Sequence, residues 1–258
     1  MRPTGLEGRI VVVTGALGGI GRAICRAALD EGMRVVATDV NVADGTSLAD
    51  GHRADALRVE TLDVRDARAV DAMIDRVEAE WGPVDCGVNA AGVLATGLAT
   101  DLSADEWQRL FDVNVTGVFN VSRALARVMA PRGRGAIVTV GSNAGGLPRH
   151  GMAAYGASKA AAMLFTRSLG LELAASGIRC NVVAPGSTRT PMLAPVLDAG
   201  GEEALIAGDL AIYKNGIPLR KLAEPRDIAD AVLFLLSDRA SHITMGSLYV
   251  DGGAALHE

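Results

Sequence analysis

The chain has 258 residues, of which 49% are hydrophobic and 21% charged, and its formal net charge is −5. This composition excludes a disordered chain, because enough apolar material is present to build a core. The sequence contains neither a run of Lys and Arg nor an uncharged apolar stretch of membrane-spanning length, so neither nucleic acid nor a membrane is expected as a partner.

Short β-branched runs alternate with longer segments of helical period, beginning with a strand at 9–13 and a helix at 19–31. Further strands are predicted at 34–39, 57–63, 84–89, 136–140, 178–184 and 248–250, and further helices at 67–81, 104–129, 153–175 and 227–236. Apolar strands separated by helices are typical of a parallel sheet covered on both faces. The predicted fold is α/β, a single doubly wound Rossmann-type domain over residues 1–258.

One late segment, at about 190–219, departs from this alternation. Its helical character is interrupted by Pro195, Gly200, Gly201, Gly208 and Gly216. Such an excursion in a compact domain is often a binding loop or lid, and a disordered surface loop is the alternative. We predict a substrate loop or lid here.

A glycine turn follows the first strand with the spacing Gly15-x-x-x-Gly19-x-Gly21. Gly15 permits a sharp turn, Gly19 lets the backbone approach a pyrophosphate, and Gly21 allows close packing of helix on strand. The amide groups at this helix start would face the phosphates of a dinucleotide. Leu17 and Ile20, within the turn, are therefore also predicted to contact the cofactor.

The second predicted strand ends at Asp39, 18 residues after Gly21. A carboxylate there can accept hydrogen bonds from ribose hydroxyls and repels a 2′-phosphate. No Lys or Arg lies inside the glycine turn, so the pattern favours NAD over NADP. The alternative role of Asp39 is a turn residue that ends its strand.

Further motifs, in their order and spacing, resemble the short-chain dehydrogenase/reductase family over about 8–253. They are Asn89-Ala90-Ala91-Gly92, Asn114, Ser142, Tyr155-x-x-x-Lys159, Pro185-Gly186 and Val250-Asp251-Gly252-Gly253. The family usually shows Asn-Asn-Ala-Gly at the first of these, which is a mild departure. Each motif alone is more often structural than catalytic, and the conjunction downstream of a cofactor turn favours catalysis.

Tyr155 and Lys159 lie four residues apart on a predicted helix, so both project from one face. An adjacent ammonium is expected to lower the tyrosine pKa from its usual value of about 10, so that the phenolate removes an alcohol proton. Ser142 is expected to hydrogen-bond the substrate oxygen. The resemblance also assigns Lys159 to the nicotinamide ribose and Asn114 to a water relay behind Lys159. Hydride passes to the nicotinamide ring, so no metal is predicted.

The resemblance implies a wider set of cofactor contacts. These are Asp63, Val64, Asn89, Ala90, Gly92, Tyr155, Lys159, Pro185, Gly186, Thr188 and Thr190. Asp63 and Val64 match the adenine-contacting pair after the third strand. Thr188 and Thr190 are expected to meet the carboxamide and the pyrophosphate, and capping of the next helix is their alternative role.

The stretches at 148–159, 170–174, 178–188, 216–219 and 241–244 resemble family members that act on 2,3-dihydro-2,3-dihydroxybenzoate. That resemblance implies oxidation of the C3 alcohol by NAD to give 2,3-dihydroxybenzoate, for siderophore or other secondary metabolism. The substrate is an anion, so Arg149 is predicted to bind its carboxylate, and Met152 to pack on its ring. A solvated arginine and a core-filling methionine are the alternatives.

Two departures lie where the substrate is expected. The loop at 189–197 lacks the acidic residue and the tryptophan typical of those members, and His150 occupies a usually neutral position. The analogue trans-2,3-dihydro-3-hydroxyanthranilate therefore stays open as an alternative substrate. A non-catalytic NAD-binding redox sensor is the alternative of another class, against which the intact Ser142, Tyr155 and Lys159 argue.

Three cysteines, Cys25, Cys86 and Cys180, occur singly in apolar stretches. They are predicted to be buried reduced thiols of a cytoplasmic protein, because the five apolar-rich residues at 9–13 are too few for a signal peptide. Family analogy also implies a homotetramer that buries the helices at 104–129 and 153–175.

Overall fold

The computed structural model describes residues 3–43, 45–198 and 201–256. Its main sheet has seven parallel strands in the order β3-β2-β1-β4-β5-β6-β9. The strands are β1 (Ile10–Thr14), β2 (Arg34–Asp39), β3 (Leu57–Thr61), β4 (Val84–Asn89), β5 (Gly135–Val140), β6 (Ile178–Pro185) and β9 (Ser247–Val250). The predicted doubly wound α/β fold is confirmed.

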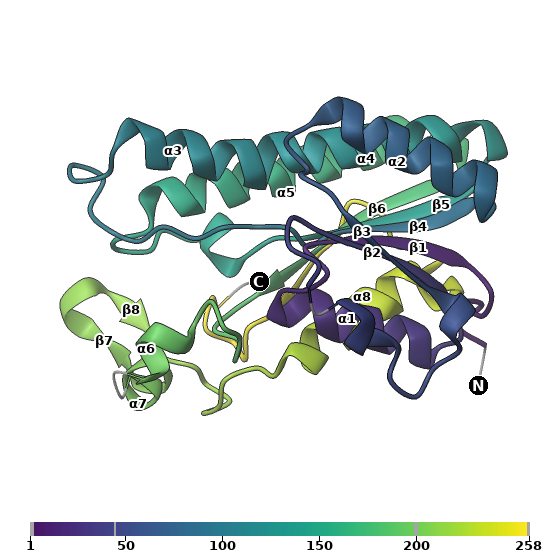
Figure 1. Cartoon of the computed structure of the whole chain (residues 1–258). Helices are drawn as coiled ribbons and strands as arrows, with labels where there is room; N and C mark the ends of the chain where they lie inside the picture. Colours follow the sequence, from purple (N-terminus) through teal and green to yellow (C-terminus); the bar gives the residue numbers. More distant parts are fainter. Residues whose placement is uncertain (1–2, 44, 199–200, 257–258) are drawn as a thin grey trace.

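Helices cover both faces of the sheet (Figure 1). One layer contains α2 (Ala67–Glu80), α3 (Ala104–Phe111), α4 (Val118–Met129) and α5 (Ala153–Leu173), and the other contains α1 (Gly19–Asp30) and α8 (Pro225–Leu236). Short 3-10 turns occupy Gly45–Ala49, Ala54–Ala56, Ala130–Arg132, Asn143–Gly145, Ala174–Ser176, Leu210–Ile212 and Asp238–Ala240. The chain leaves β3 and returns to pair β4 with the other side of β1, so the strand order reverses between β1 and β4. In doubly wound sheets, ligands bind outside the carboxyl ends of the strands at this reversal.

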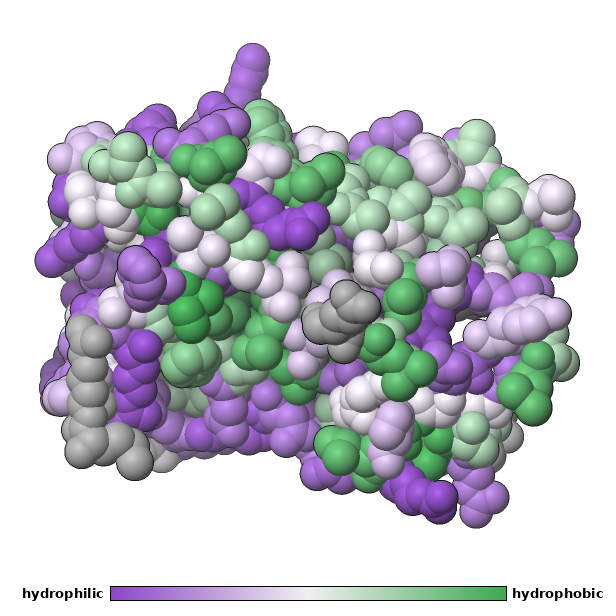
Figure 2. Space-filling model, turned by 180° about the vertical axis from the view of Figure 1, so that it is seen from behind, coloured by the Kyte–Doolittle hydropathy of each residue, from purple (hydrophilic) through white to green (hydrophobic). Residues whose placement is uncertain are grey.

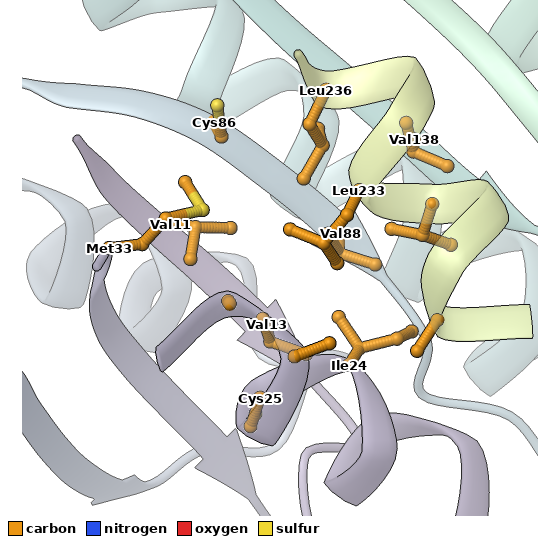
Figure 3. Packing of buried hydrophobic residues seen from close by; sticks show 14 of the residues in the cluster. Val11, Val13, Ile24, Cys25, Met33, Cys86, Val88, Val138, Leu233 and Leu236 are labelled. Atoms are coloured by element: carbon orange, nitrogen blue, oxygen red, sulfur yellow. The ribbon is translucent and has the colours of Figure 1, made fainter. Parts of the chain in front are cut away.

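The core alternates along β1 because successive strand residues face opposite sides. Val11 and Val13 face α1 and α8, whereas Ile10 and Val12 face the other layer. Figure 3 shows Ile24 of α1 and Leu233 of α8 packed with Val13 and the neighbouring strand residues. Burial of each such side chain stabilises the fold by about 1.5–3 kcal/mol.

The helix predicted at 104–129 contains a π-helical stretch, Asp112–Gly117, between α3 and α4. A π turn accommodates an extra residue within a continuing helix and re-aims the side chains beside it. Here the buried Asn114 lies in that stretch and bonds to the backbone of Val93. The smaller differences are that the strand predicted at 57–63 ends at Thr61 and the helix predicted at 153–175 ends at Leu173.

Ordered elements occupy the segment predicted as a loop or lid. They are α6 (Ala194–Asp198), α7 (Glu202–Ala207) and a hairpin of β7 (Gly208–Asp209) and β8 (Lys214–Asn215). A small separate core of Leu205, Ile217, Leu222 and Ala254 holds this segment, called the lid segment (190–219) from this point on, against the C-terminal turn. Gly200, predicted as one of its helix breakers, lies outside the described residues.

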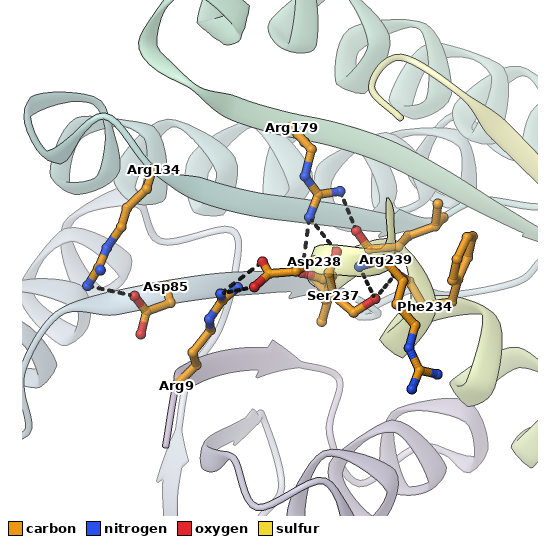
Figure 4. Close-up of polar contacts among 10 residues, drawn as sticks. Arg9, Asp85, Arg134, Arg179, Phe234, Ser237, Asp238 and Arg239 are labelled. Carbon is orange, nitrogen blue, oxygen red and sulfur yellow. Dashed lines mark hydrogen bonds and ion pairs between the residues drawn. The ribbon is translucent and has the colours of Figure 1, made fainter. Parts of the chain in front are cut away.

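Polar contacts tie together the amino ends of the strands (Figure 4). The Arg9 guanidinium donates to the Asp238 carboxylate at 2.9 Å, and the Arg134 guanidinium lies 3.2 Å from the Asp85 carboxylate. Arg179 donates to the carbonyls of Leu235, Leu236 and Ser237 at the end of α8. These bonds satisfy carbonyl groups that a helix end leaves without an intrahelical partner.

Cys25, Cys86 and Cys180 are buried and unpaired, as predicted. Burial raises the pKa of each thiol to about 12, so these groups are inert neutral side chains of the core. In the parts of the chain that the structure describes, every helix is too short or too polar to cross a bilayer.

Candidate active site

A cleft of about 1090 Å³ opens at the carboxyl edge of the sheet. In the view from behind in Figure 2, the surface is hollowed between the upper helical layer and the lower lobe formed by the lid segment. The predicted site residues that line the cleft are Gly15, Leu17, Gly19, Ile20, Asp39, Asp63, Val64, Ala90, Gly92, Ser142, Arg149, Met152, Tyr155, Lys159, Pro185, Gly186, Thr188 and Thr190. Two predicted site residues, Asn89 and Asn114, do not line it.

The glycine turn brings the start of α1 to the floor of this cleft. Gly15 has a φ of 63°, and a Cβ on it would lie 2.6 Å from the Cα of Ala91. The helix begins at Gly19 with no side-chain cap and no acidic residue in its first turn. Its free amide groups and the positive end of its dipole therefore face the cleft, which fits the pyrophosphate of a dinucleotide.

Asp39 closes the same turn at the end of β2. Its Oδ2 accepts a hydrogen bond of 3.0 Å from the Leu17 amide, and its Oδ1 accepts one of 3.4 Å from the Asn41 amide. The bond from Leu17, 22 residues away, and the bond from Asn41, two residues away, together hold the Asp39 carboxylate in the cleft wall. This position fits a ribose whose hydroxyls donate to a carboxylate.

Asp63 and Val64 form the cleft wall beyond the ends of β2 and β3. Arg65 donates to Asp63 with a shortest distance of 2.6 Å, and this bond lowers the pKa of the carboxyl group. The pair is therefore a fixed ion pair beside the expected adenine position. Val64 offers apolar surface to a base there.

Asn89 lies in the protein interior instead of the cleft. Its amide nitrogen donates to the hydroxyl groups of Ser122 at 2.9 Å and Thr139 at 3.1 Å, and the residue is buried. The side chain therefore ties β4 to α4 and β5. The residues that follow it, Ala90, Ala91 and Gly92, line the cleft.

Ser142, Tyr155 and Lys159 converge where β5 ends beside the first turns of α5. Ser142 and Tyr155 share a side-chain hydrogen bond. The Lys159 ammonium donates to the Val140 carbonyl at 3.0 Å and lies 5.9 Å from the centroid of the Tyr155 ring. The hydroxyl, the phenol and the ammonium therefore line one short stretch of the cleft, as the spacing predicts.

Burial shifts the pKa values of Tyr155 and Lys159, and the shift of Tyr155 is opposite to the one that the sequence predicts. Desolvation raises the pKa of Tyr155, and the hydrogen bond with Ser142 opposes this rise. Desolvation also lowers the pKa of Lys159 to about 8. The expected lowering of the Tyr155 pKa by Lys159 is therefore not found in the free protein, because burial disfavours charge on both groups.

Asn114 lies directly behind Lys159. Its Oδ1 accepts from the Val93 amide at 2.9 Å, while its Nδ2 donates to the Val93 carbonyl at 3.0 Å and to the Ser158 hydroxyl at 3.0 Å. A Cβ added at Gly92 would lie 3.3 Å from both Asn114 Oδ1 and Lys159 Nζ. The Asn114 amide and the Lys159 ammonium therefore both lie next to Gly92. Asn114 is placed there by the π turn.

The segment after β6 covers the glycine turn. The Thr188 hydroxyl donates to the Gly186 carbonyl at 3.1 Å, and the Thr190 hydroxyl donates to the Thr188 carbonyl at 3.3 Å. A Cβ on Gly19 would lie 2.7 Å from the Thr190 methyl group. Thr190 thus packs directly over the expected pyrophosphate position, with the oxygen atoms of both hydroxyls still able to accept hydrogen bonds.

Several residues that line the cleft were not predicted from the sequence. They include Arg22, Arg109, Leu205, Lys214, Ile217 and Ala254. Those from the lid segment and the C-terminal turn carry no local motif that indicates a site. One signal was present, since the chain contains only three lysines and Lys214 is one of them. Among the described residues, no group of three His, Cys, Asp or Glu side chains is arranged to hold a metal ion.

The chain matches one protein family and is similar in sequence to several known enzymes. A family model described as "Enoyl-(Acyl carrier protein) reductase" matches residues 15–255. The chain is 51% identical to a 2,3-dihydro-2,3-dihydroxybenzoate dehydrogenase of Bacillus subtilis (strain 168), over 99% of each chain. It is 44% identical to the protein of the same name in Escherichia coli (strain K12), over 97% of this chain and 98% of the other.

A solved structure has a closely similar fold. It is a gluconate 5-dehydrogenase from Burkholderia cenocepacia J2315 in complex with NADP and tartrate, with a TM-score of 0.90 and 30% sequence identity. The alignment covers 99% of this chain and 98% of that one. The similarity therefore extends over the cleft as well as the sheet.

Proposed function

Because the chain belongs to the short-chain dehydrogenase/reductase family, whose members use NAD(P), we propose that it oxidises 2,3-dihydro-2,3-dihydroxybenzoate to 2,3-dihydroxybenzoate. One observation carries the proposal: Ser142, Tyr155 and Lys159 converge in one cleft of a chain that is 51% identical to an enzyme of that name. The product is a catechol acid, and the role that fits it is siderophore or other secondary metabolism in the cytoplasm.

In the proposed reaction, the C3 alcohol of the substrate loses a proton and a hydride. The Ser142 hydroxyl holds the substrate oxygen, and the Tyr155 phenolate takes the proton from it. When bound, an oxidised nicotinamide cofactor would supply the acceptor for the hydride, and its positive charge would favour the phenolate of Tyr155. The resulting C3 ketone then tautomerises to the aromatic ring.

Lys159 and Asn114 position this chemistry. The Lys159 ammonium offers a hydrogen bond to the nicotinamide ribose and electrostatic support to the phenolate. Burial lowers the pKa of this ammonium group to about 8. Asn114, beside Lys159 at Gly92, is the proposed anchor of a water relay that carries the proton away.

We propose NAD as the cofactor instead of NADP. The Asp39 carboxylate lies at the end of β2, where it faces the expected ribose and repels a 2′-phosphate. Replacement of Asp39 by Ala tests this assignment. The ratio of kcat/KM with NAD to kcat/KM with NADP is expected to fall, because the repulsion of the 2′-phosphate is lost.

Arg149 and Met152 are the proposed substrate contacts. Both line the cleft on the loop that leads into α5, within six residues of Tyr155. A guanidinium binds a carboxylate through two parallel hydrogen bonds, and the thioether of Met152 packs on a ring. The lid segment is proposed to cover the cleft, since Thr190 packs over Gly19 at the glycine turn and Lys214 and Ile217 line the cleft wall.

A homotetramer is proposed from the family and from the outer surface of the upper layer. Phe119 of α4 and Leu164 and Leu171 of α5 are 45%, 58% and 68% exposed. Apolar side chains of this size on neighbouring helices are typical of surfaces that pair with another copy. Light scattering of the purified protein tests the subunit number.

A side-by-side kinetic assay tests the reaction. The purified protein is mixed with NAD and either the diol or trans-2,3-dihydro-3-hydroxyanthranilate, and NADH and the aromatic product are followed. A higher kcat/KM with the diol supports the proposal, and a higher value with the amino alcohol assigns the alternative. Reduction of NAD with neither compound would favour a non-catalytic redox sensor.

A further inference from the structure

The lid segment contributes a cation to the cleft wall, Lys214. The chain has 25 Lys and Arg residues, and only three of them are lysines: Lys159, Lys214 and Lys221. Two of the three, Lys159 and Lys214, line the cleft, and Lys221 does not. A lysine in the cleft wall thus stands out in a chain whose basic residues are almost all arginine.

The backbone of the hairpin directs Lys214 back toward the cleft. Lys214 lies opposite Asp209 in the β7–β8 pair, immediately after a turn in which Tyr213 has a φ of 53°. The side chains at that turn are almost fully exposed, with Leu210 at 94% and Tyr213 at 95%, whereas Lys214 is half-buried. The chain therefore reverses at Tyr213, and the ammonium group lies on the inner side.

Arg149 lines the same cleft, from the loop that leads into α5. Its guanidinium donates to the Ala254 carbonyl at 3.4 Å, and Ala254 belongs to the small core that holds the lid segment. Burial lowers the pKa of Lys214, and the positive charge of Arg149, which lines the same cleft, lowers it further. Like charges brought together in a partly dry cleft are destabilising unless an anion joins them.

No carboxylate of the described residues forms an ion pair with either cation. The nearest acid is Asp209, whose charge opposes the lowering of the Lys214 pKa but whose Oδ1 accepts a hydrogen bond of 2.9 Å from the Ala211 amide. Most other arginines of the chain are paired, for example Arg189 with Glu202 and Glu224. The free pair in the cleft is therefore a site for an anion that the protein does not supply.

We infer that Lys214 and Arg149 together form the carboxylate subsite for the substrate, with Lys214 as a specificity-determining residue contributed by the lid segment. This inference rests on the proposed function for the identity of the acid. Arg149 supplies a planar pair of donors, and Lys214 supplies a compact charge from the other side of the carboxylate. Because one of the two cations is on the lid segment, an acid in the cleft also draws that segment against α5.

Calorimetry with saturating NADH tests the subsite without turnover. The ligands are 2,3-dihydroxybenzoate and catechol, which differ only in the carboxylate, and the proteins are wild type, Lys214→Met, Lys214→Arg and Lys221→Met. In Lys214→Met the affinity for the acid is expected to fall roughly 10- to 100-fold, the loss of one charged hydrogen bond. Catechol affinity is expected to stay within about twofold. Lys214→Arg is expected to recover most of the affinity for the acid, and Lys221→Met is the matched control that leaves both ligands unchanged.

Three outcomes overturn the inference: wild type that binds the two ligands equally, Lys214→Met that keeps the affinity for the acid, or equal losses for acid and catechol. If Lys214→Met does not fold, as its thermal melt shows, Lys214→Gln replaces it. Turnover of the diol by wild type is measured in parallel. Lys214-dependent binding of the acid without turnover leaves the inference standing and contradicts the proposed function, whereas turnover with unchanged binding in Lys214→Met does the reverse.

Discussion

Several charged side chains at the two edges of the sheet are used differently, although the carboxyl edge also holds the Arg65–Asp63 ion pair. At the amino edge, Arg9 lies against Asp238, and Arg179 donates to three carbonyl groups at the end of α8. At the carboxyl edge, Arg149, Lys159 and Lys214 line the cleft with no carboxylate in ion-pair contact among the described residues. Charges that are satisfied within the protein stabilise the fold, and charges that are left unsatisfied are available to ligands.

At the carboxyl edge, removal of the Tyr155 hydroxyl is expected to reduce activity more than any other change considered. Tyr155→Phe removes the proposed base and keeps the ring, so kcat is expected to fall by about 10²- to 10⁴-fold, the usual contribution of a general base. The melting temperature is expected to change little, since only one hydroxyl is lost. Kinetics of diol oxidation and a thermal melt measure both. Unchanged turnover would falsify the proposed mechanism.

Lys159, at the same edge, is expected to lower the free energy of unfolding of the protein at neutral pH. Its pKa is lowered from 10.5 to about 8, so between these pH values the unfolded chain binds more protons and the free energy of unfolding rises with pH. Lys159→Met is therefore expected to be about 3 kcal/mol more stable than wild type at neutral pH and nearly inactive. The advantage is expected to shrink as the pH rises through the range from about 8 to 10.5.

Urea unfolding of wild type and Lys159→Met at several pH values measures this difference, because the other titrating groups are common to both proteins. A gap that stays constant with pH, or a wild type that is the more stable protein at neutral pH, contradicts the expected destabilisation by Lys159.

At the amino edge, replacement of Arg179 is expected to lower stability and to leave activity unchanged. Arg179→Met leaves the carbonyl groups at the end of α8 without their charged donor, which is expected to cost about 1.5–2 kcal/mol of unfolding free energy. The values of kcat and KM are expected to stay unchanged, because Arg179 lies near the start of β6, whereas the cleft is lined by residues from the end of that strand onward. Arg127→Met is the matched control, since its ion pair with Asp75 is exposed on both sides. Equal stabilities of Arg179→Met and Arg127→Met, or a loss of activity in Arg179→Met, would contradict the expectation that Arg179 stabilises the fold and takes no part in catalysis.

The Arg9–Asp238 pair is expected to give the smallest effect. Its side chains are 32% and 44% exposed, so the coupling energy is expected to be below about 1 kcal/mol. A double-mutant cycle with Arg9→Gln and Asp238→Asn measures that energy. It is expected to fall further in about 1 M salt, where exposed charges are screened. A coupling energy that is larger, and insensitive to salt, means that the pair behaves as a buried one.

The helices and strands of the main sheet were predictable because their patterns are local. The alternation of apolar runs with helical segments located all seven strands of the parallel sheet, and the glycine spacing located the start of α1. The family motifs likewise brought Ser142, Tyr155 and Lys159 together, since two of them share one helix face. The comparison with known proteins confirmed the family.

Other features depended on contacts between distant residues. Asn89 was predicted to contact the cofactor, but its amide binds Ser122 and Thr139 in the interior. Asn114, which lies in the π turn, accepts a hydrogen bond from the amide of Val93, 21 residues away along the chain. Neither contact has a signature in the neighbouring sequence.

The sequence by itself determined the order of strands and helices, the phosphate-facing turn and the catalytic spacing, because each depends on residues a few positions apart. Only the tertiary structure decided that burial raises the pKa of Tyr155 and lowers that of Lys159, since desolvation is a property of the surrounding packing. It also decided that Arg149 and Lys214 line the same cleft. This arrangement depends on the small core between the lid segment and Ala254, which no local pattern encodes.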